Sequence, residues 1–279
     1  MHQRSPRTAS NVRFHYVPML LMGLLLLGLS LLGPAHVSAE GPPCGEVTCV
    51  TSVDELRDAI EAANSTEGPT VIYLTPGQTY QVSDIVPEYD SPLTGGQNAF
   101  PVIDGLMRIT VAGEGTSATI VNETNSRFFE ISPSGDLTLE SITLRHGSAQ
   151  LGGAIYNDGY LNINGGVLEE NNAVGAEGGV PGRSGGGGGG GAGIGGAIYN
   201  SFASSTTIYA TTFRDNSAIG GDGGDTLDYP GDGADYNGGT GGGPTGGVGG
   251  IGSAPGEDGG YISGGGGGSN TSGCRGAAP

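Results

Sequence analysis

The hexapeptide Gly152-Gly153-Ala154-Ile155-Tyr156-Asn157 occurs a second time, unchanged, as Gly195-Gly196-Ala197-Ile198-Tyr199-Asn200. A hexapeptide repeated without change in one chain indicates a repeat architecture, which has to be identified before single residues are interpreted. Three further segments, at 143–149, 167–173 and 212–218, align with one another. Their final alanines are 24 and 45 residues apart.

An insertion explains the longer interval. A glycine-rich stretch of about 20 residues (175–194) precedes the second hexapeptide, and without it the 43-residue spacing of the two hexapeptides falls to 23. Segment 215–224 resembles 170–179, so a second glycine-rich insertion begins after Ala218. The sequence therefore predicts one unit of about 24 residues, with insertions accepted at one fixed place.

A unit of this length that holds two or three short strands and no helix is one coil of an all-β solenoid. Each strand pairs in parallel with its equivalent above and below. Short β-type runs without intervening helices exclude a doubly wound α/β fold. Strand spacing alone also permits a sandwich or a barrel, and the repeat decides against both.

The hexapeptide has a structural role in this interpretation. Strand alternation predicts that Ile155 and Ile198 point inward and stack, and that either the tyrosine pair or the asparagine pair forms a second ladder at a corner. The paired glycines permit positive φ and therefore tight corners. The residues assigned to the repeat are Gly152, Gly153, Ile155, Asn157, Gly195, Gly196, Ile198 and Asn200.

One amphipathic helix is expected before the first strands, over residues 52–64. Ser52 followed by Glu55 fits a capping box, in which each side chain accepts an amide of the first turn. Val53, Leu56, Ala59, Ile60 and Ala63 fall on one face of this helix. Because the first coil has unpaired strand edges, we expect the helix to cover that open end.

The start of the chain has the pattern of a secretory signal peptide over residues 1–39. Three arginines precede an apolar run at 19–32, and Val37-Ser38-Ala39 suits a signal peptidase. The run is short for a membrane span, and an uncleaved anchor is the alternative. We therefore expect a secreted or bacterial cell-surface protein with no integral membrane segment after cleavage. A β-helix domain (40–218) and a glycine-rich, largely flexible tail or corner insertion (219–279) would follow.

The mature chain would be strongly acidic, because no acid precedes Glu40 and only seven arginines follow it. Its net charge is −21, which excludes nucleic acid as a partner and favours divalent cations or cationic partners. In an exported protein, Cys44 and Cys49 are expected to form a disulfide. Cys274 would then be free or intermolecular.

One segment matches a calcium-binding pattern. Residues 220–228 fit the nonapeptide G-G-x-G-x-D-x-U-x, whose glycines turn the chain so that oxygens converge on a hard cation. Calcium rolls use tandem copies, and the next segment departs from the pattern, so a solvated acidic loop is the competing interpretation. The candidate ligands are Asp222, Asp225, Asp228, Asp232 and Asp235.

Two stretches resemble known families. The Gly-Gly-Ala-Ile hexapeptides resemble the GGA[ILV] repeats of polymorphic outer membrane proteins, and more widely those of exported right-handed parallel β-helix proteins with the pectin-lyase-like fold. Residues 56–64 are similar to the Leu-Arg-Glu-Ala-Ile-x-Ala-Ala-Asn segment (CSLREA type) that opens such proteins, with Asp54-Glu55 in place of its leading Cys-Ser. The resemblance implies a right-handed parallel β-helix, export and an adhesive role.

The catalytic alternatives find little support in the residues. Glycoside hydrolysis needs two carboxylates about 5–9.5 Å apart, but the chain has no Asp-Asp pair and its acids lie mostly beside turns. A lyase needs a basic proton abstractor; lysine is absent, and Arg145 and Arg214 share one repeat position, which indicates a structural role. His146 is expected at a solvated corner. We assign no catalytic residue.

The leading hypothesis is an exported, non-enzymatic β-helix protein with an adhesive or interaction role, whose ligand is a host, cell-surface or polysaccharide component. A carbohydrate-active β-helix enzyme (polysaccharide lyase or hydrolase) and a calcium-stabilised surface spacer are the alternatives. Calcium is the single cofactor considered.

Overall fold

The computed structural model describes residues 42–91, 96–181, 186–225, 239–243, 247–248, 256–259 and 263. All of them belong to one compact unit, Glu40–Pro279. The predicted signal peptide (1–39) lies outside the described residues, as do Cys274 and three of the calcium candidates, Asp228, Asp232 and Asp235.

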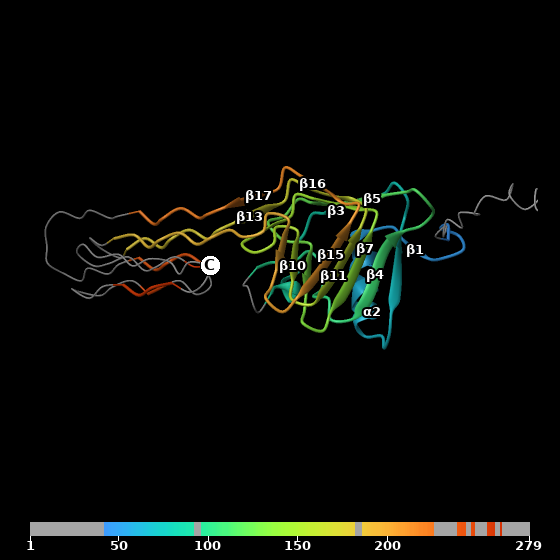
Figure 1. Cartoon of the computed structure of the whole chain (residues 1–279), viewed down its shortest axis with the longest axis horizontal. Helices are drawn as coiled ribbons and strands as arrows, with labels where there is room; N and C mark the ends of the chain where they lie inside the picture. The colour runs from blue at the N-terminus through green and yellow to red at the C-terminus, as the bar shows by residue number, and fades with distance from the viewer. Residues whose placement is uncertain are drawn as a thin grey trace, which may run out of the picture. The chain divides into compact units, whose positions relative to one another are not determined.

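The described strands form four sheets in which every pairing is parallel. The six-stranded sheet has the order β1-β2-β4-β7-β11-β15, and Figure 1 shows β4, β7, β11 and β15 side by side in this order. The five-stranded sheet has the order β16-β12-β8-β5-β3. Two three-stranded sheets follow, the β10 sheet (β14-β10-β6) and the β13 sheet (β17-β13-β9). The chain is therefore an all-β fold of parallel sheets with few helices.

The strands are short, as the turn residues between the β-type runs predict. The six-stranded sheet contains Cys49–Val50, Thr70–Leu74, Leu106–Val111, Asp136–Glu140, Tyr160–Asn164 and Ser205–Tyr209 (β1, β2, β4, β7, β11, β15). The five-stranded sheet contains Thr79–Val82, Ala118–Asn122, Ile142–Arg145, Val167–Glu169 and Thr212–Arg214 (β3, β5, β8, β12, β16). The β10 sheet contains Phe129–Ile131, Ile155–Asn157 and Ile198–Asn200 (β6, β10, β14); the β13 sheet contains Ser148–Ala149, Asn172–Val174 and Ser217–Ile219 (β9, β13, β17).

The chain visits these sheets in a recurring order, and each passage adds one layer. From β10 it proceeds through β11, β12 and β13, and it then returns to the first of these sheets as β14. The strand register reproduces the alignment of the repeats, since Ala149, Ala173 and Ala218 are paired in succession. Ile155 is likewise paired with Ile198. We refer to β14–β17 as the last layer.

Two rows of apolar side chains run through the layers and contribute to the core. Alternation along each strand directs every second side chain inward, and the parallel register stacks these inward residues. In the six-stranded sheet the row is Ile72, Ile109, Leu139, Ile163 and Ile208. In the five-stranded sheet it is Tyr80, Ile120, Leu144, Leu168 and Phe213.

The hexapeptide glycines occupy tight corners. Gly152 and Gly195 have φ of 63° and 71°, a region in which a side chain is strained. A Cβ on Gly152 would lie 2.0 Å from the carbonyl oxygen of Ile155, and one on Gly153 would lie 2.2 Å from that of Gly196. Both glycines are therefore required by close backbone approach, which supports a structural role for the hexapeptide.

The predicted helix is present as α2, Val53–Asn64, with Ser52 as its N-cap. The amide of Glu55 donates to Ser52 Oγ (3.2 Å). The reciprocal contact differs from a capping box, because the Glu55 carboxylate accepts the amide of Thr51 (2.7 Å) and the Thr51 hydroxyl (2.8 Å). These bonds lower the pKa of Glu55. The side chain thus satisfies an amide one residue earlier than the motif predicts.

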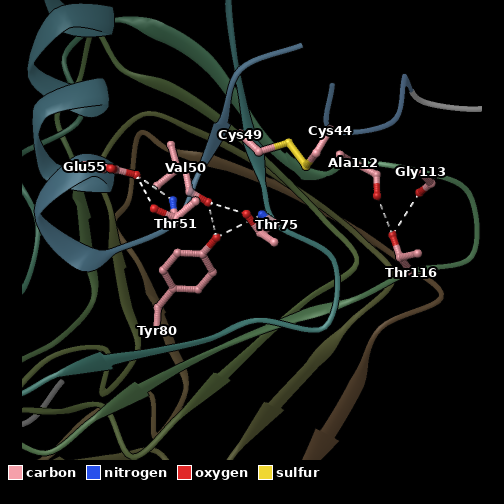
Figure 2. Close-up of a disulfide and its surroundings, with 10 residues drawn as sticks. All are labelled: Cys44, Cys49, Val50, Thr51, Glu55, Thr75, Tyr80, Ala112, Gly113 and Thr116. Atoms are coloured by element: carbon pink, nitrogen blue, oxygen red, sulfur yellow. Dashed lines mark hydrogen bonds between the residues drawn. A yellow bond between two sulfur atoms is a disulfide. The ribbon is translucent and has the colours of Figure 1, made fainter. Parts of the chain in front are cut away.

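The N-terminal end of the strands is closed by α2 and by a disulfide. The helix packs against β2, β3 and β4, and Leu56, Ile60 and Ala63 lie within the hydrophobic core. Cys44 forms a disulfide with Cys49, the first residue of β1, as Figure 2 shows. In the same view, the Tyr80 hydroxyl donates to the carbonyl oxygen of Val50 (2.6 Å) and so connects β3 to β1.

Candidate interaction surfaces

Glycine-rich segments extend from two successive layers at the same corner, after β13 and after β17. They continue the pairing of these strands, because the amide of Gly175 donates to the carbonyl of Ile219 and that of Gly178 to the carbonyl of Asp222, both at 2.8 Å. Figure 1 shows the continuations of β13 and β17 running alongside each other. We call the described residues 175–181, 186–193, 220–225 and 239–243 the glycine arm.

The hydrogen bonds of the glycine arm recur every third residue. Gly188 and Gly191 donate back to Gly179 and Ala176 (2.9 and 2.8 Å). The same spacing recurs in two further sets of bonds, from Gly221 and Gly224 to Gly191 and Gly188, and from Gly239 and Gly242 to Gly186 and Gly189. A period of three matches the polyproline II helix, which has no internal hydrogen bonds and leaves its amides available to neighbouring segments.

Burial in the glycine arm has the same period. Gly175, Gly178 and Pro181 are buried, whereas Ala176 and Glu177 are exposed. A Cβ on Gly178 would lie 2.0 Å from the Gly188 carbonyl oxygen, so the segments approach too closely for a side chain at this buried position. Side chains are accepted at the positions that face outward. The arm is therefore packed through its backbone.

The sequence predicts that much of 219–279 is flexible, because this segment can bury little apolar surface. Most of this segment lies outside the described residues. Among those that are described, 221, 224, 239 and 242 donate backbone hydrogen bonds to the first insertion. Glycine permits backbone-to-backbone packing that a hydrophobicity argument does not count.

The two described calcium candidates lie in this arm. Asp222 and Asp225 are exposed, and the backbone carbonyl of Asp222 accepts the bond from Gly178. Within the described residues, no group of three or more His, Cys, Asp or Glu side chains converges on one point. The described residues of the segment that matches the nonapeptide, 220–225, contribute backbone hydrogen bonds to the arm.

A cluster of charged side chains lies where the five-stranded sheet turns into the β13 sheet. Arg145 Nε lies 2.7 Å from Glu170 Oε2, and His146 Nε2 lies 2.7 Å from the same oxygen. Glu169 pairs with Arg214 and lies 3.8 Å from Arg145. His146, Glu170 and Asp215 occupy equivalent positions and all have positive φ, between 53° and 67°.

These charges contact one another across the layers. Hydrogen bonds from Arg145 and then from His146 lower the pKa of Glu170, and the hydrogen bond to Glu170 raises the pKa of Arg145. Arg145 is paired in register with Glu169, which is paired with Arg214. The arrangement is an ionic ladder between layers, in agreement with the structural role predicted for Arg145 and Arg214.

Two asparagine pairs connect successive layers. Asn157 Nδ2 donates to Asn200 Oδ1 (2.8 Å), and Asn171 Nδ2 donates to Asn216 Oδ1 (2.9 Å). Asn171 also accepts the amide of Gly147 (2.8 Å). The second pair was not predicted, although Asn171 and Asn216 occupy the same position in the aligned repeats.

An aromatic and cationic group lies beside the first asparagine pair. The rings of Tyr156 and Tyr199 stack at 5.3 Å, so tyrosine and asparagine ladders both form where the sequence analysis expected one or the other. The guanidinium of Arg127 lies 5.3 Å from the Tyr156 ring centroid and donates to the carbonyl of Leu151 (3.0 Å). Burial lowers the pKa of Arg127. This arginine is enclosed by the core and does not contact solvent.

The last layer has an open face that the sequence analysis did not identify. A depression of about 660 Å³ lies at its end. Apolar side chains form part of it, and the polar side chains include the ends of both asparagine pairs. Its lining residues are Ala197, Ile198, Asn200, Thr206, Ile208, Phe213, Arg214, Asp215 and Asn216.

No protein-family model, curated protein or solved structure matches the chain. In the part of the chain that the structure describes, no helix combines the length and the apolar character needed to cross a bilayer. The assignment of a function therefore depends on the geometry of the glycine arm, the polar ladders and the last layer.

Proposed function

We propose that this chain is an exported, right-handed parallel β-helix protein that binds a ligand at the bacterial surface or in the medium and catalyses no reaction. The recurring visit to the same parallel sheets and the continuous apolar rows support the β-helix. The resemblance to polymorphic outer membrane proteins supports the right hand and the adhesive role. The pattern of residues 1–39 supports export.

The observation that carries a binding role is the way the glycine arm leaves the strands. Its first hydrogen bonds extend the register of β13 and β17, so a regular scaffold holds a backbone-packed element in a fixed direction. Proteins commonly place binding residues on connections that a rigid scaffold positions. The ionic ladder and the two asparagine pairs contact one another across the layers, which supports a role in the scaffold.

The ligand class that fits the proposal is a host, cell-surface or polysaccharide component. The outward positions of the arm hold a small set of side chains, among them Glu177, Val180 and Asp222. Carbonyl groups on a packed glycine surface accept hydrogen bonds from hydroxyl groups, which are abundant on carbohydrates. The net charge of −18 for the whole chain favours neutral or cationic ligands over anionic ones.

The test compares two adjacent glycines of the arm. A Cβ on Gly224 would lie 2.1 Å from the Gly179 carbonyl oxygen, whereas one on Gly223 has its nearest atom at 3.6 Å. The secreted wild type, Gly224→Ala and Gly223→Ala are assayed for binding to neutral and acidic polysaccharides and to whole cells. We expect Gly224→Ala alone to weaken binding, by about tenfold, which corresponds to about 1.4 kcal/mol.

Two results would contradict the proposal. Release of unsaturated or reducing-end products from any polysaccharide would show that the chain is an enzyme. Equal binding by both variants would show that the glycine arm does not present the ligand site.

A further inference from the structure

The two ends of the parallel strands differ in how they are covered. At the N-terminal end, α2 packs against β2, β3 and β4 and inserts Leu56 and Ile60 into the core. At the other end, β14, β15, β16 and β17 are each the last strand of their sheet. All four therefore present one edge without a strand partner among the described residues.

The exposed fraction of the inward side chains rises abruptly at the last layer, although these side chains still point towards the core. Ile163 and Leu168 are 3 % and 1 % exposed, while Ile208 and Phe213, their partners in register, are 44 % and 46 % exposed. These side chains occupy the same inward rows. Among the described residues no further layer stacks on them, and the depression of about 660 Å³ lies at this end of the core.

An uncovered end of this kind exposes apolar side chains and unpaired strand edges to solvent, which favours association with another chain. Unpaired strand edges with apolar side chains are templates for association, and proteins normally shorten, charge or cover them. The described last layer lacks a helix comparable to α2. Its edge strands include the five residues of β15, with Ile208 in an inward position.

We propose that a second copy of this chain binds to this open end, so that the two last layers meet across a two-fold axis. The partner must present unpaired strand edges around a group of apolar side chains, arranged as they are in one layer of this fold. A second last layer offers both. The opposite end of the chain cannot serve, because α2 covers it.

This asymmetry also sets the size of the assembly. A contact between unlike ends would continue into a filament, whereas a contact between two identical ends closes as a dimer. The rim of the depression includes Arg214 and Asp215, which have opposite charges. In the dimer, each rim therefore presents both signs of charge to the other rim. The contact is argued from Ile208 and Phe213 and does not depend on the ligand proposed above.

Ionic strength gives the contact a recognisable signature. The chain has a net charge of −18, so two copies repel each other at long range. Added salt screens this repulsion and leaves apolar burial in place. The dimer should therefore become tighter as the salt concentration rises.

The experiment is sedimentation velocity of the secreted chain over a range of concentrations, at low and high salt. We expect a monomer–dimer equilibrium that shifts towards dimer at high salt, with no larger species. Ile208→Asp and Phe213→Asp should each raise the dimer Kd by about 100-fold or more, because each would bury an unpaired charge. Thr207→Asp, an exposed outward position on the same strand, is the matched control and should change the Kd by less than about threefold.

A second measurement separates loss of the dimer from loss of the fold. Amide hydrogen exchange in β15 and β16 should slow as the wild-type concentration rises, while exchange in β4 and β5 stays constant. A chain that sediments as a monomer at every concentration would overturn the proposal. So would an equal effect of Ile208→Asp and Thr207→Asp, or a filament in place of a closed dimer.

Discussion

The layered strands and the glycine arm are both packed closely, but the strands pack through side chains and the arm packs through its backbone. In the strands, fully buried side chains such as Ile155 and Leu144 remove apolar surface from water, at about 25 cal/mol per Å². In the arm, contacts between backbones replace side chains, and each hydrogen bond contributes about 0.5–1.5 kcal/mol net. Glycine weakens a strand but is required in the arm, because its lack of a Cβ permits the close approach.

This difference predicts that the strands are destabilised when a buried side chain is removed, and that the arm is destabilised when a side chain is added. Leu144→Ala removes a fully buried side chain between Ile120 and Leu168. We expect a loss of about 2–5 kcal/mol in the free energy of unfolding, measured by denaturant titration. The control Thr143→Ala, on the outward side of the same strand, should cost less than about 1 kcal/mol. Similar losses for both variants would contradict the inward row.

The opposite substitution tests the arm. A Cβ on Gly221 would lie 2.2 Å from the Ala176 carbonyl oxygen, whereas the nearest atom to one on Gly220 is 3.7 Å away. Gly221→Ala should therefore separate the segments and speed amide exchange at Gly188 and Gly191 by about tenfold, equal to about 1.4 kcal/mol. Exchange within β11 should not change, since the core is not touched.

Gly220→Ala is the matched control for this prediction. It adds the same methyl group to the neighbouring residue and should leave exchange in the arm unchanged. If the two variants give the same exchange rates at Gly188 and Gly191, the close backbone packing of the arm is wrong.

The two regions also differ in how far the sequence alone predicts them. The register of the layers follows from the aligned repeats, because a ladder needs similar residues at a fixed interval, as Ala149, Ala173 and Ala218 show. The helix and its N-cap at Ser52 follow from local pattern. The pairing of Gly175 with Ile219 could not be predicted in this way. The residues that pack closest in the arm are glycines, which have no side chains and therefore form no hydrophobic pattern.

The open end of the last layer was not predicted for a different reason. Phe213 and Leu168 have the same position in the repeat and the same apolar character, so the sequence makes them equivalent. What differs is the number of neighbouring layers, which is a property of the assembled sheets. A repeat pattern describes the interior of an array well and its ends poorly.

The ionic ladder between layers gives the smallest expected effect. Arg145 and His146 lower the pKa of Glu170 in the folded chain, so folding is favoured while this carboxylate is charged. That contribution is complete above the unfolded glutamate pKa of about 4.3 and is lost as the pH falls through the lower folded value. Because the group is exposed to solvent, the change in melting temperature between neutral and acidic pH should be small.

Glu170→Gln tests this contribution by removing the titrating group while retaining its shape. The variant should melt slightly below wild type at neutral pH, and the difference should vanish in acid, because wild-type Glu170 is then protonated as well. Glu177→Gln, an exposed glutamate of the glycine arm, is the control and should follow the wild-type melting curve at each pH. A Glu170→Gln difference that persists unchanged in acid would assign the effect to packing and would remove the ionic ladder from the forces that hold the layers together.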